Sequence, residues 1–232
     1  MNKKTFAGFA QEGLDFLQNV KKNNSKAWFE ENKDVYQKHL LKPFQSLVTD
    51  LVDTMLAIDD NFEIRPSVNK TISRIYRDTR FSKDKSLFKN TMWLTFKRPI
   101  KDWKDAPAYF FELSPNSYRY GMGYYSASRN TMDILRKNID EKPSEFLNVI
   151  SFYNKQNLFT LEGEKYKKIL NDRMPKYIQE WYQRKSFYLV HNSEIDDHLF
   201  SPILIDELIS GFKMLKPLYR YLWKIYHIQN QA

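Results

Sequence analysis

The residues with the clearest chemical potential lie in one basic segment, residues 74–89, with the sequence RIYRDTRFSKDKSLFK. The segment holds three arginines and three lysines against two aspartates. The planar guanidinium of arginine suits two-pronged binding of a phosphate or carboxylate, whereas lysine supplies a mobile point charge. One anion could therefore be bound here, with Asp78 orienting an arginine. The cations that could build this site are Arg74, Arg77, Arg80, Lys83, Lys85 and Lys89.

The same residues allow two other interpretations. Asp78 and Asp84 could pair within the segment, with Arg74, Arg80 or Lys85, and hold a tight turn. The spacing of Arg74 and Asp78 would even suit an i,i+4 pair on a helix. The segment could also be a solvated basic strand. Because exposed ion pairs contribute only ~0–1 kcal/mol, the pattern leaves the anion site, the internal salt-bridge scaffold and the plain surface open.

The order of these residues resembles a family motif, R-x-x-R-D-x-R-F-x-x-[DN]-K-x-x-Y. Its matching positions are Arg74, Arg77, Asp78, Arg80, Phe81, Asp84 and Lys85. The last position departs from the motif, because Phe88 replaces the Tyr and so keeps the ring without its hydroxyl. The family is the bacterial domain of unknown function (DUF) family 2461, a set of conserved hypothetical proteins of about this length. The resemblance covers nearly the whole chain, at Phe6 to Phe9, Asn23-Asn24, Trp28-Phe29, Tyr36, Pro43-Phe44, Tyr109 to Leu113, Gly121–Gly123, Pro217-Leu218 and Leu222.

The resemblance implies that residues 74–85 are special to the protein, but it implies no particular reaction. The residues themselves name neither a nucleophile nor a general base, so the sequence leaves catalysis open. A binding site is the first hypothesis, for a small or polymeric anion. The competing hypothesis is structural: an Arg–Asp network would lock the sheet to its helices, and function would lie in a protein partner.

Other chemical motifs are weak or absent. The four histidines, which lack the paired spacing of metal ligands, are His39, His191, His198 and His227. Gly121-Met122-Gly123 has no third glycine and no strand-to-helix context for a dinucleotide loop, so it is read as punctuation within a sheet. The chain contains no cysteine, which excludes disulfides and thiolate sites. We therefore expect no metal and no cofactor.

A nucleic-acid module is the second alternative, because aromatic side chains stand between the basic residues. The aromatics concerned are Tyr76, Phe81, Phe88, Trp93 and Phe96. Aromatic rings stack on single-stranded bases. However, Trp93 and Phe96 would point to opposite faces of a strand, and the known nucleic-acid signatures are absent. A nucleic-acid partner is therefore possible but not favoured.

Charge and hydropathy limit the partners and the cellular location that the protein can have. The formal net charge is +9, of which residues 61–100 contribute +7, with ten Lys and Arg against three Asp and Glu. A basic block of this kind is one feature of proteins that bind an anionic partner. Gln11, Glu12 and Asp15 interrupt any signal-peptide core, and no run approaches the ~18 apolar residues of a membrane span. We expect a soluble, cytoplasmic protein without a membrane partner, and the sequence gives no oligomeric state.

The elements that must position the basic segment follow from the apolar periodicity. A stripe at spacings of three and four after Pro43 predicts a helix with Leu47, Leu51 and Leu56 buried and with Asp50 and Asp53 facing water. Asn24 or Ser25 is expected to cap the helix before it. Further helices are predicted near 131–139, 144–153 and 203–212, the last after Ser201-Pro202, and Pro217 should kink or restart the final helix.

From about Thr71 to Tyr125 the period changes to two, which predicts an antiparallel meander. Its strands are expected at Thr91–Lys97, Tyr109–Leu113 and Tyr118–Tyr124, with a hairpin at Ser114–Ser117. Residues 187–190 form one more apolar run, typical of a buried strand. Helices, then a meander, then helices make an α+β fold, with an antiparallel sheet flanked by N-terminal and C-terminal helices. Because no linker or repeat interrupts the chain, we predict one domain over residues 1–232.

Overall fold

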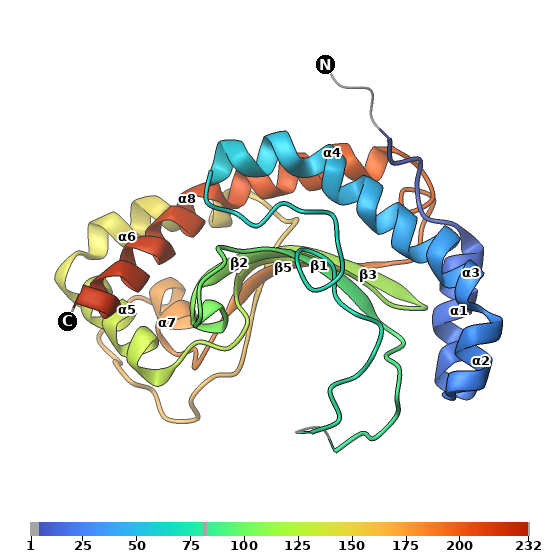
Figure 1. The fold of residues 1–232 in the computed structure, drawn as a ribbon. Coiled ribbons are helices and arrows are strands. Elements are labelled where there is room, and N and C mark those ends of the chain that lie inside the picture. The colour runs from blue at the N-terminus through green and yellow to red at the C-terminus, as the bar shows by residue number, and fades with distance from the viewer. Residues whose placement is uncertain (1–4, 81–82, 232) are drawn as a thin grey trace. The chain divides into compact units, whose positions relative to one another are not determined.

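The computed structural model describes residues 5–80 and 83–231 and has the mixed helix and sheet architecture that the periodicity predicts (Figure 1). Two compact units can be distinguished. Unit 1 comprises Met1–Phe96, Phe110–Tyr120 and Asn192–Ser210, and unit 2 comprises Lys97–Tyr109, Gly121–His191 and Gly211–Ala232. The two units are described separately, and the single domain over residues 1–232 stays a prediction.

Over the described residues, the strands form one five-stranded antiparallel sheet with the order β1-β2-β3-β5-β4. The strands are β1 (Met92–Phe96), β2 (Pro107–Leu113), β3 (Ser117–Tyr124), β4 (Thr160–Glu162) and β5 (Tyr188–Glu194). The predicted meander and the late apolar strand are therefore confirmed. Ser114 and Ser117 close the hairpin between β2 and β3, since the Ser114 N–H donates to the Ser117 carbonyl at 2.9 Å. The short strand β4, which pairs antiparallel with β5, was not predicted.

Unit 1 begins with a run of helices before the sheet. These are α1 (Gln11–Lys22), α2 (Lys26–Glu31), α3 (Lys33–Tyr36), a π-helical turn (Gln37–Leu41) and α4 (Lys42–Ile58). Of the two predicted caps, Ser25 caps α2, because its hydroxyl accepts a hydrogen bond from the Trp28 N–H at 3.3 Å. Pro43 lies in the first turn of α4, where its missing N–H costs nothing.

The apolar stripe of α4 is largely as predicted. Leu47 and Leu51 are fully buried and Asp53 is exposed, but Leu56 is only half-buried. The prediction for Asp50 is wrong. Its carboxylate accepts hydrogen bonds from the backbone N–H groups of Thr5 at 2.7 Å and Phe6 at 2.8 Å, so Asp50 fixes the N-terminal segment instead of facing water.

Aromatic side chains fill the core of unit 1. Phe9 lies between Phe44, at 5.1 Å between ring centroids, and Phe111 of β2, at 5.8 Å in a stacked arrangement. Phe29 of α2 stacks on Phe88 at 4.6 Å. Such ring pairs contribute about 0.5–1.5 kcal/mol beyond the area that they bury. Helix α2 is thereby joined to the residue that ends the family motif.

Unit 2 contains α5 (Arg129–Glu141), α6 (Pro143–Ile150), α7 (Lys176–Tyr182) and short 3-10 turns at Trp103–Asp105 and Tyr153–Lys155. The long helix α8 (Ile203–Gln231) supplies its last part to this unit. Ser201 accepts a hydrogen bond from the Ile203 N–H at 3.3 Å at the start of α8, which follows Ser201-Pro202 as predicted. Helix α8 continues through Pro217, so of the two predicted effects, a kink or a restart, the restart does not occur. Among the described residues, no helix combines the length and the apolar character needed to cross a bilayer.

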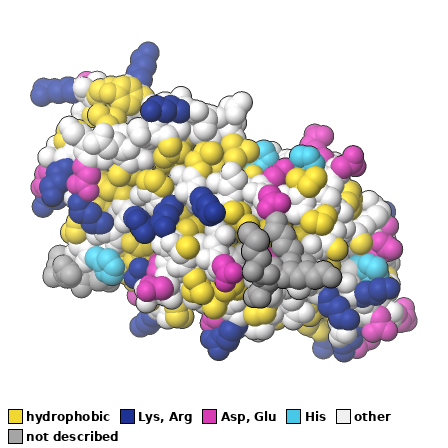
Figure 2. Space-filling view, turned by 90° about the horizontal axis from the view of Figure 1, so that it is seen from above, with side chains coloured by type: hydrophobic (Ala, Val, Ile, Leu, Met, Phe, Trp, Pro, Cys, Tyr) yellow, Lys and Arg dark blue, Asp and Glu magenta, His cyan; other side chains and the backbone are white. Residues whose placement is uncertain are grey.

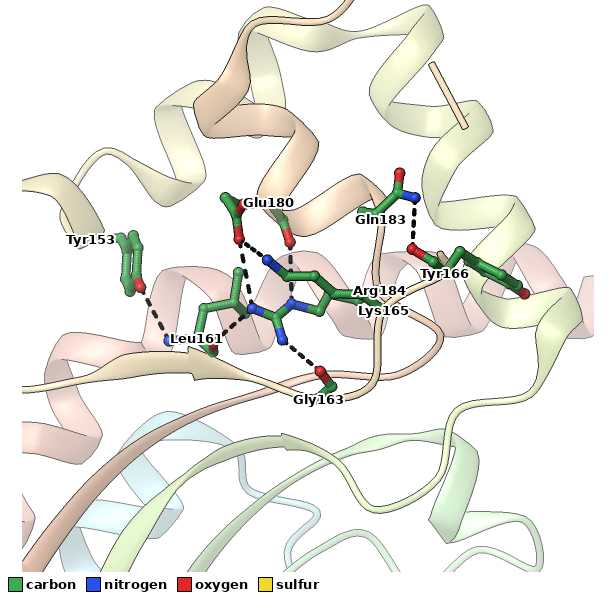
Figure 3. Close-up of polar contacts among 8 residues, drawn as sticks. All are labelled: Tyr153, Leu161, Gly163, Lys165, Tyr166, Glu180, Gln183 and Arg184. Atoms are coloured by element: carbon green, nitrogen blue, oxygen red, sulfur yellow. Dashed lines mark hydrogen bonds and ion pairs between the residues drawn. The ribbon is translucent and has the colours of Figure 1, made fainter. Parts of the chain in front are cut away.

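Two buried arginines organise the loops of unit 2. Figure 3 shows Arg184, whose guanidinium donates to the carbonyls of Gly163 at 2.5 Å and Leu161 at 2.9 Å, and whose Nε donates to the Glu180 carbonyl at 3.2 Å. Arg136 donates in the same way to the carbonyls of Tyr182, at 2.9 Å, and Arg184, at 2.6 Å. Both residues are less than a tenth exposed. Their hydrogen bonds hold chain segments that have no regular ladder of their own.

Candidate site on the basic segment

The basic segment forms the outer part of an irregular hairpin that spans residues 71–95. Near the sheet, Ile72 pairs antiparallel with Leu94 of β1, and further out Tyr76 pairs with Phe88. The Arg77 N–H donates to the Leu87 carbonyl at 2.8 Å, and the Lys89 N–H donates to the Ile75 carbonyl at 2.9 Å. Figure 1 shows these two limbs extending away from the strands in green. Arg77 and Lys89 are thus diagonal neighbours across the two limbs, which places them on one face.

Two side chains from the helical part of unit 1 anchor the returning limb. Phe88 is buried against Phe29, so the Phe that replaces the motif Tyr acts through ring packing. Asn24 binds both backbone groups of Phe88: its Nδ2 donates to the carbonyl, its Oδ1 accepts from the N–H, and each distance is 3.0 Å. Asn24 thereby supplies the two hydrogen bonds that a neighbouring strand would otherwise make to Phe88. Sequence reasoning assigned Asn24 only as a possible cap, and its place in the family resemblance was the one available signal.

Each aspartate of the segment binds an arginine. Asp78 accepts two hydrogen bonds from Arg80, at 3.0 Å from Nε and 2.8 Å from Nη2, and these bonds lower the pKa of Asp78 well below its usual range. Asp84 lies 3.0 Å from Arg77 Nη2, and Arg77 Nε donates to the Ser86 hydroxyl at 3.0 Å. The Arg80 side chain is 74% exposed, so its pair lies in solvent. The internal pairs therefore exist, but they are surface pairs within the hairpin.

The remaining predicted cations have different surroundings. Arg74 Nη2 lies 3.7 Å from Asp78 Oδ2, on backbone that is not helical, so the helical i,i+4 pair is absent. Lys85 Nζ donates to the Thr79 carbonyl at 2.7 Å near the tip of the hairpin. Lys83 is exposed. Phe81, which also belongs to the motif, lies outside the described residues.

Three cations of the two limbs influence one another electrostatically: Arg74, Arg77 and Lys89, here called the cation cluster. The half-buried Lys89 places its Nζ 3.8 Å from the centroid of the Trp93 ring. Burial, and then the positive charges of Arg74 and Arg77, lower the pKa of Lys89 to about 8. Glu112 of β2 opposes this shift, but its carboxylate is also bound by Arg119 of β3 at 2.7 Å. The cluster thus concentrates positive charge that its neighbours only partly compensate.

The cation cluster differs from the arginine sites of unit 2. Arg136 and Arg184 are buried and direct their N–H groups to backbone carbonyls, which is the arrangement of structural arginines. Arg74 is nearly half exposed, and its Nη2 lies 3.7 Å from the carboxylate of Asp78. The Arg77 side chain is 24% exposed and binds side chains only. Of the predicted set, the structure brings together Arg74, Arg77 and Lys89 and leaves Arg80, Lys83 and Lys85 toward the tip.

The other residues considered from the sequence have structural surroundings. His198 pairs with Glu207 at the start of α8, and His191 Nδ1 lies 3.1 Å from the Leu158 carbonyl. Within residues 5–80 and 83–231, no group of three or more histidines and carboxylates is arranged to hold a metal ion. A Cβ on Gly121 would collide with the Leu189 carbonyl of β5, so this glycine permits close approach of two strands, as its reading as sheet punctuation implies.

Comparison with known proteins identifies the family. A search among curated proteins finds no match. One family model, described as conserved hypothetical protein (DUF2461), matches residues 12–221, and this range contains the whole basic segment, Asn24, Phe29 and the sheet. The match spans far more than half of the chain, and it agrees with the resemblance carried by the motif of residues 74–88. The chain therefore belongs to the DUF2461 family of conserved hypothetical proteins.

Proposed function

We propose that the protein binds the phosphate or carboxylate group of an anionic ligand at the cation cluster. The observation that carries this proposal is the position of Arg74, Arg77 and Lys89 on the two paired limbs of one hairpin, where burial and then the charges of the two arginines lower the pKa of Lys89 to about 8. Gathering like charges is unfavourable in the absence of a partner, because each charge disfavours the charged form of the next. An anion between them would remove that cost.

The hydrogen-bonding capacity of the cluster also supports an anion. Arginine presents five donors in a planar fork that matches the geometry of phosphate and carboxylate. Asp84 and Ser86 fix the orientation of Arg77 through Nη2 and Nε, at 3.0 Å each, which prepares the guanidinium before a ligand arrives. Arg74, whose nearest acid is 3.7 Å away, supplies a second fork. Asn24 and Phe29 hold the returning limb that carries Lys89.

A structural role is the second candidate, and the pairing of Asp78 with Arg80 and of Asp84 with Arg77 favours it. In that case the pairs would only shape the hairpin, and a protein partner would carry the function. The exposure of both pairs argues for a small contribution, because surface ion pairs contribute about 0–1 kcal/mol.

A nucleic-acid partner is the third candidate, and it has less support. Trp93 and Phe96 lie on opposite faces of β1, where Phe96 is buried, so they cannot line one groove. Figure 2 shows basic, acidic and hydrophobic side chains interspersed on one face of the molecule. We also infer a cytoplasmic location in a bacterial cell, from the composition and from the family resemblance, and we expect no membrane partner.

Titration with sulfate and inorganic phosphate tests the anion site. Arg74→Gln, Arg77→Gln and Lys89→Gln should each weaken binding by about 1.5–3 kcal/mol, the contribution of a hydrogen bond to a charged group. The matched controls are Arg80→Gln and Lys85→Gln, which remove the same charge from the tip of the same hairpin. They should change affinity by less than about threefold, because exposed charges at a distance are screened by salt.

Two outcomes would contradict the proposal. Equal losses at the cluster and at the tip would indicate diffuse attraction by a basic surface, of the kind that steers polyanions. An absence of binding, together with lower melting temperatures for Arg77→Gln and Arg80→Gln, would support the structural candidate instead. A short single-stranded DNA added in the same titration tests the third candidate, since its affinity should fall steeply with salt.

A further inference from the structure

Lys89 is the most unusual member of the cation cluster, because its amine is fixed in place and partly withdrawn from water. The Trp93 ring covers one side of Nζ at 3.8 Å, a distance at which a cation interacts with the face of an indole. The backbone of Lys89 is bound to Ile75 at 2.9 Å, and the preceding residue, Phe88, is held by Asn24. Lys83 and Lys85 have no comparable cover, since both are exposed.

The Trp93 ring attracts the ammonium form of Lys89, but burial and the neighbouring charges favour the neutral form. Burial and the guanidinium groups of Arg74 and Arg77 lower its pKa to about 8. At pH 7.5 about a quarter of the molecules would then carry the neutral amine, against about one in a thousand for an ordinary lysine. The neutral amine is the nucleophile, and desolvation next to other cations is one way in which proteins activate a lysine.

We propose that Lys89 forms an imine with a carbonyl compound whose phosphate or carboxylate group is held by Arg74 and Arg77. This inference rests on the proposed anion site and gives the three cations separate roles. The nitrogen of Lys89 adds to the carbonyl carbon, and a proton passes from nitrogen to oxygen to give a carbinolamine. Loss of one water molecule then leaves the C=N bond, so the step needs neither an oxidant nor a reductant.

The arrangement of the cluster fits this division of roles. Arg74 and Arg77 lie on the outgoing limb, and Lys89 lies on the returning limb, so an anionic group at the arginines would direct the rest of a small molecule toward the other limb. The arginines keep their charge throughout the accessible pH range, whereas the lysine can lose its proton. The ligand class is therefore a small aldehyde or ketone that carries a phosphate or a carboxylate.

Labelling of the native full-length chain with pyridoxal 5′-phosphate, followed by cyanoborohydride reduction and peptide mapping, tests this inference. Lys89 should be modified at least about tenfold faster than Lys85, a matched lysine on the same hairpin, because the neutral fractions differ by more than that. Excess inorganic phosphate should slow the reaction of Lys89 and leave that of Lys85 unchanged. Pyridoxal, which has the aldehyde without the phosphate, should lose most of this preference.

Two variants and a pH profile complete the experiment. Lys89→Arg keeps the charge and should abolish the fast label, whereas Lys85→Arg should leave it unchanged. Reductive methylation with formaldehyde, a neutral reagent, should show a midpoint near pH 8 for Lys89. A midpoint near pH 10.4, the value of an ordinary lysine, would contradict the activation of Lys89.

The outcomes separate the two proposals. If pyridoxal 5′-phosphate labels Lys85 and Lys89 at similar rates while sulfate binding still depends on the cluster, the imine inference is overturned and the anion site stands. If Lys89 is labelled fast by pyridoxal and pyridoxal 5′-phosphate alike, without protection by phosphate, the lysine is reactive but the anionic ligand class is wrong. Sulfate titration of the cluster variants then decides the anion site itself.

Discussion

Arginine and lysine side chains of this protein occupy two kinds of environment. Arg136 and Arg184 are buried and bind backbone carbonyls, whereas the cation cluster is partly open to solvent and lies among other cations. The energetic consequences are opposite. Substitution of a buried arginine leaves backbone carbonyls without hydrogen-bond donors. Substitution of a cation in the cluster instead relieves repulsion among the remaining cations.

Replacement of Arg184 by Gln should lower the free energy of unfolding by about 3 kcal/mol or more, because the carbonyls of Leu161, Gly163 and Glu180 lose a buried, charged donor. The matched control is Arg129→Gln on α5, whose side chain is 85% exposed and should stay within about 0.5 kcal/mol of the parent. Urea unfolding measures both. A small loss at Arg184 would mean that water replaces the guanidinium and that the loops do not depend on it.

Sulfate affinity should depend on pH through Lys89. Its lowered pKa, about 8, means that the ammonium loses its proton as the pH rises above that value, and the site then loses one positive charge. A bound sulfate stabilises the ammonium and shifts the loss to somewhat higher pH. Affinity should therefore fall about tenfold or more between pH 7 and pH 10.5, the contribution of one charge-assisted hydrogen bond.

Lys89→Arg is the control for this pH dependence, because arginine stays protonated and sulfate stays a dianion over the whole range. Its affinity should be nearly constant from pH 7 to pH 10.5. An equal fall in the parent and in Lys89→Arg would assign the titration to another group and remove Lys89 from the site.

At the scale of elements, the hairpin of residues 71–95 depends on the helices that flank it. Among its described residues, the outer limbs form one isolated bridge, between Tyr76 and Phe88, and a two-stranded hairpin of this kind is marginally stable alone. The stacking of Phe88 on Phe29 and the two hydrogen bonds from Asn24 supply the missing support. The position of Lys89 therefore depends on contacts that the preceding residue, Phe88, makes with Asn24, between α1 and α2, and with Phe29 of α2.

Asn24→Ala should loosen the returning limb. The backbone N–H and carbonyl of Phe88 lose their partners, which should cost about 1–3 kcal/mol of stability. Amide hydrogen exchange at Phe88 and Lys89 should quicken, and sulfate affinity should fall with it. Asn23→Ala removes a neighbouring amide that binds only the Asn19 carbonyl at 3.2 Å, and it should leave exchange in the hairpin unchanged. Equal exchange in both variants would show that Phe29 alone holds the limb.

At the scale of the whole molecule, the sequence predicts elements with long periodic patterns and misses those with short ones. Helix α4 and strands β1, β2 and β3 each carry several apolar positions in phase, so local pattern and tertiary burial agree. Strand β4 has three residues, too few to show a period. Pro217 was predicted to kink or restart its helix, and helix α8 continues through it because packing can override local propensity.

The candidate site likewise has a part that could be predicted from the sequence and a part that could not. Its charged residues are visible as a basic block, and this block lies within the range of the family match. Their grouping is not visible, because Arg74, Arg77 and Lys89 meet only after two limbs pair across the hairpin. Asn24 is 64 residues from Phe88, and Asp50 is 45 residues from Thr5, so no local pattern announces either contact.

The π-helical turn Gln37–Leu41 sets the angular phase of the helices around it. Buried side chains recur there in steps of four, at Tyr36, Leu40, Phe44 and Val48. In an ideal α-helix each such step overshoots a full turn by about 40°, so the stripe would drift by about 120° over three steps. The wider π turn takes up about one residue of that rotation. A relative that lacks one residue in this turn would keep a helix here, but it would have to move every later apolar position by one.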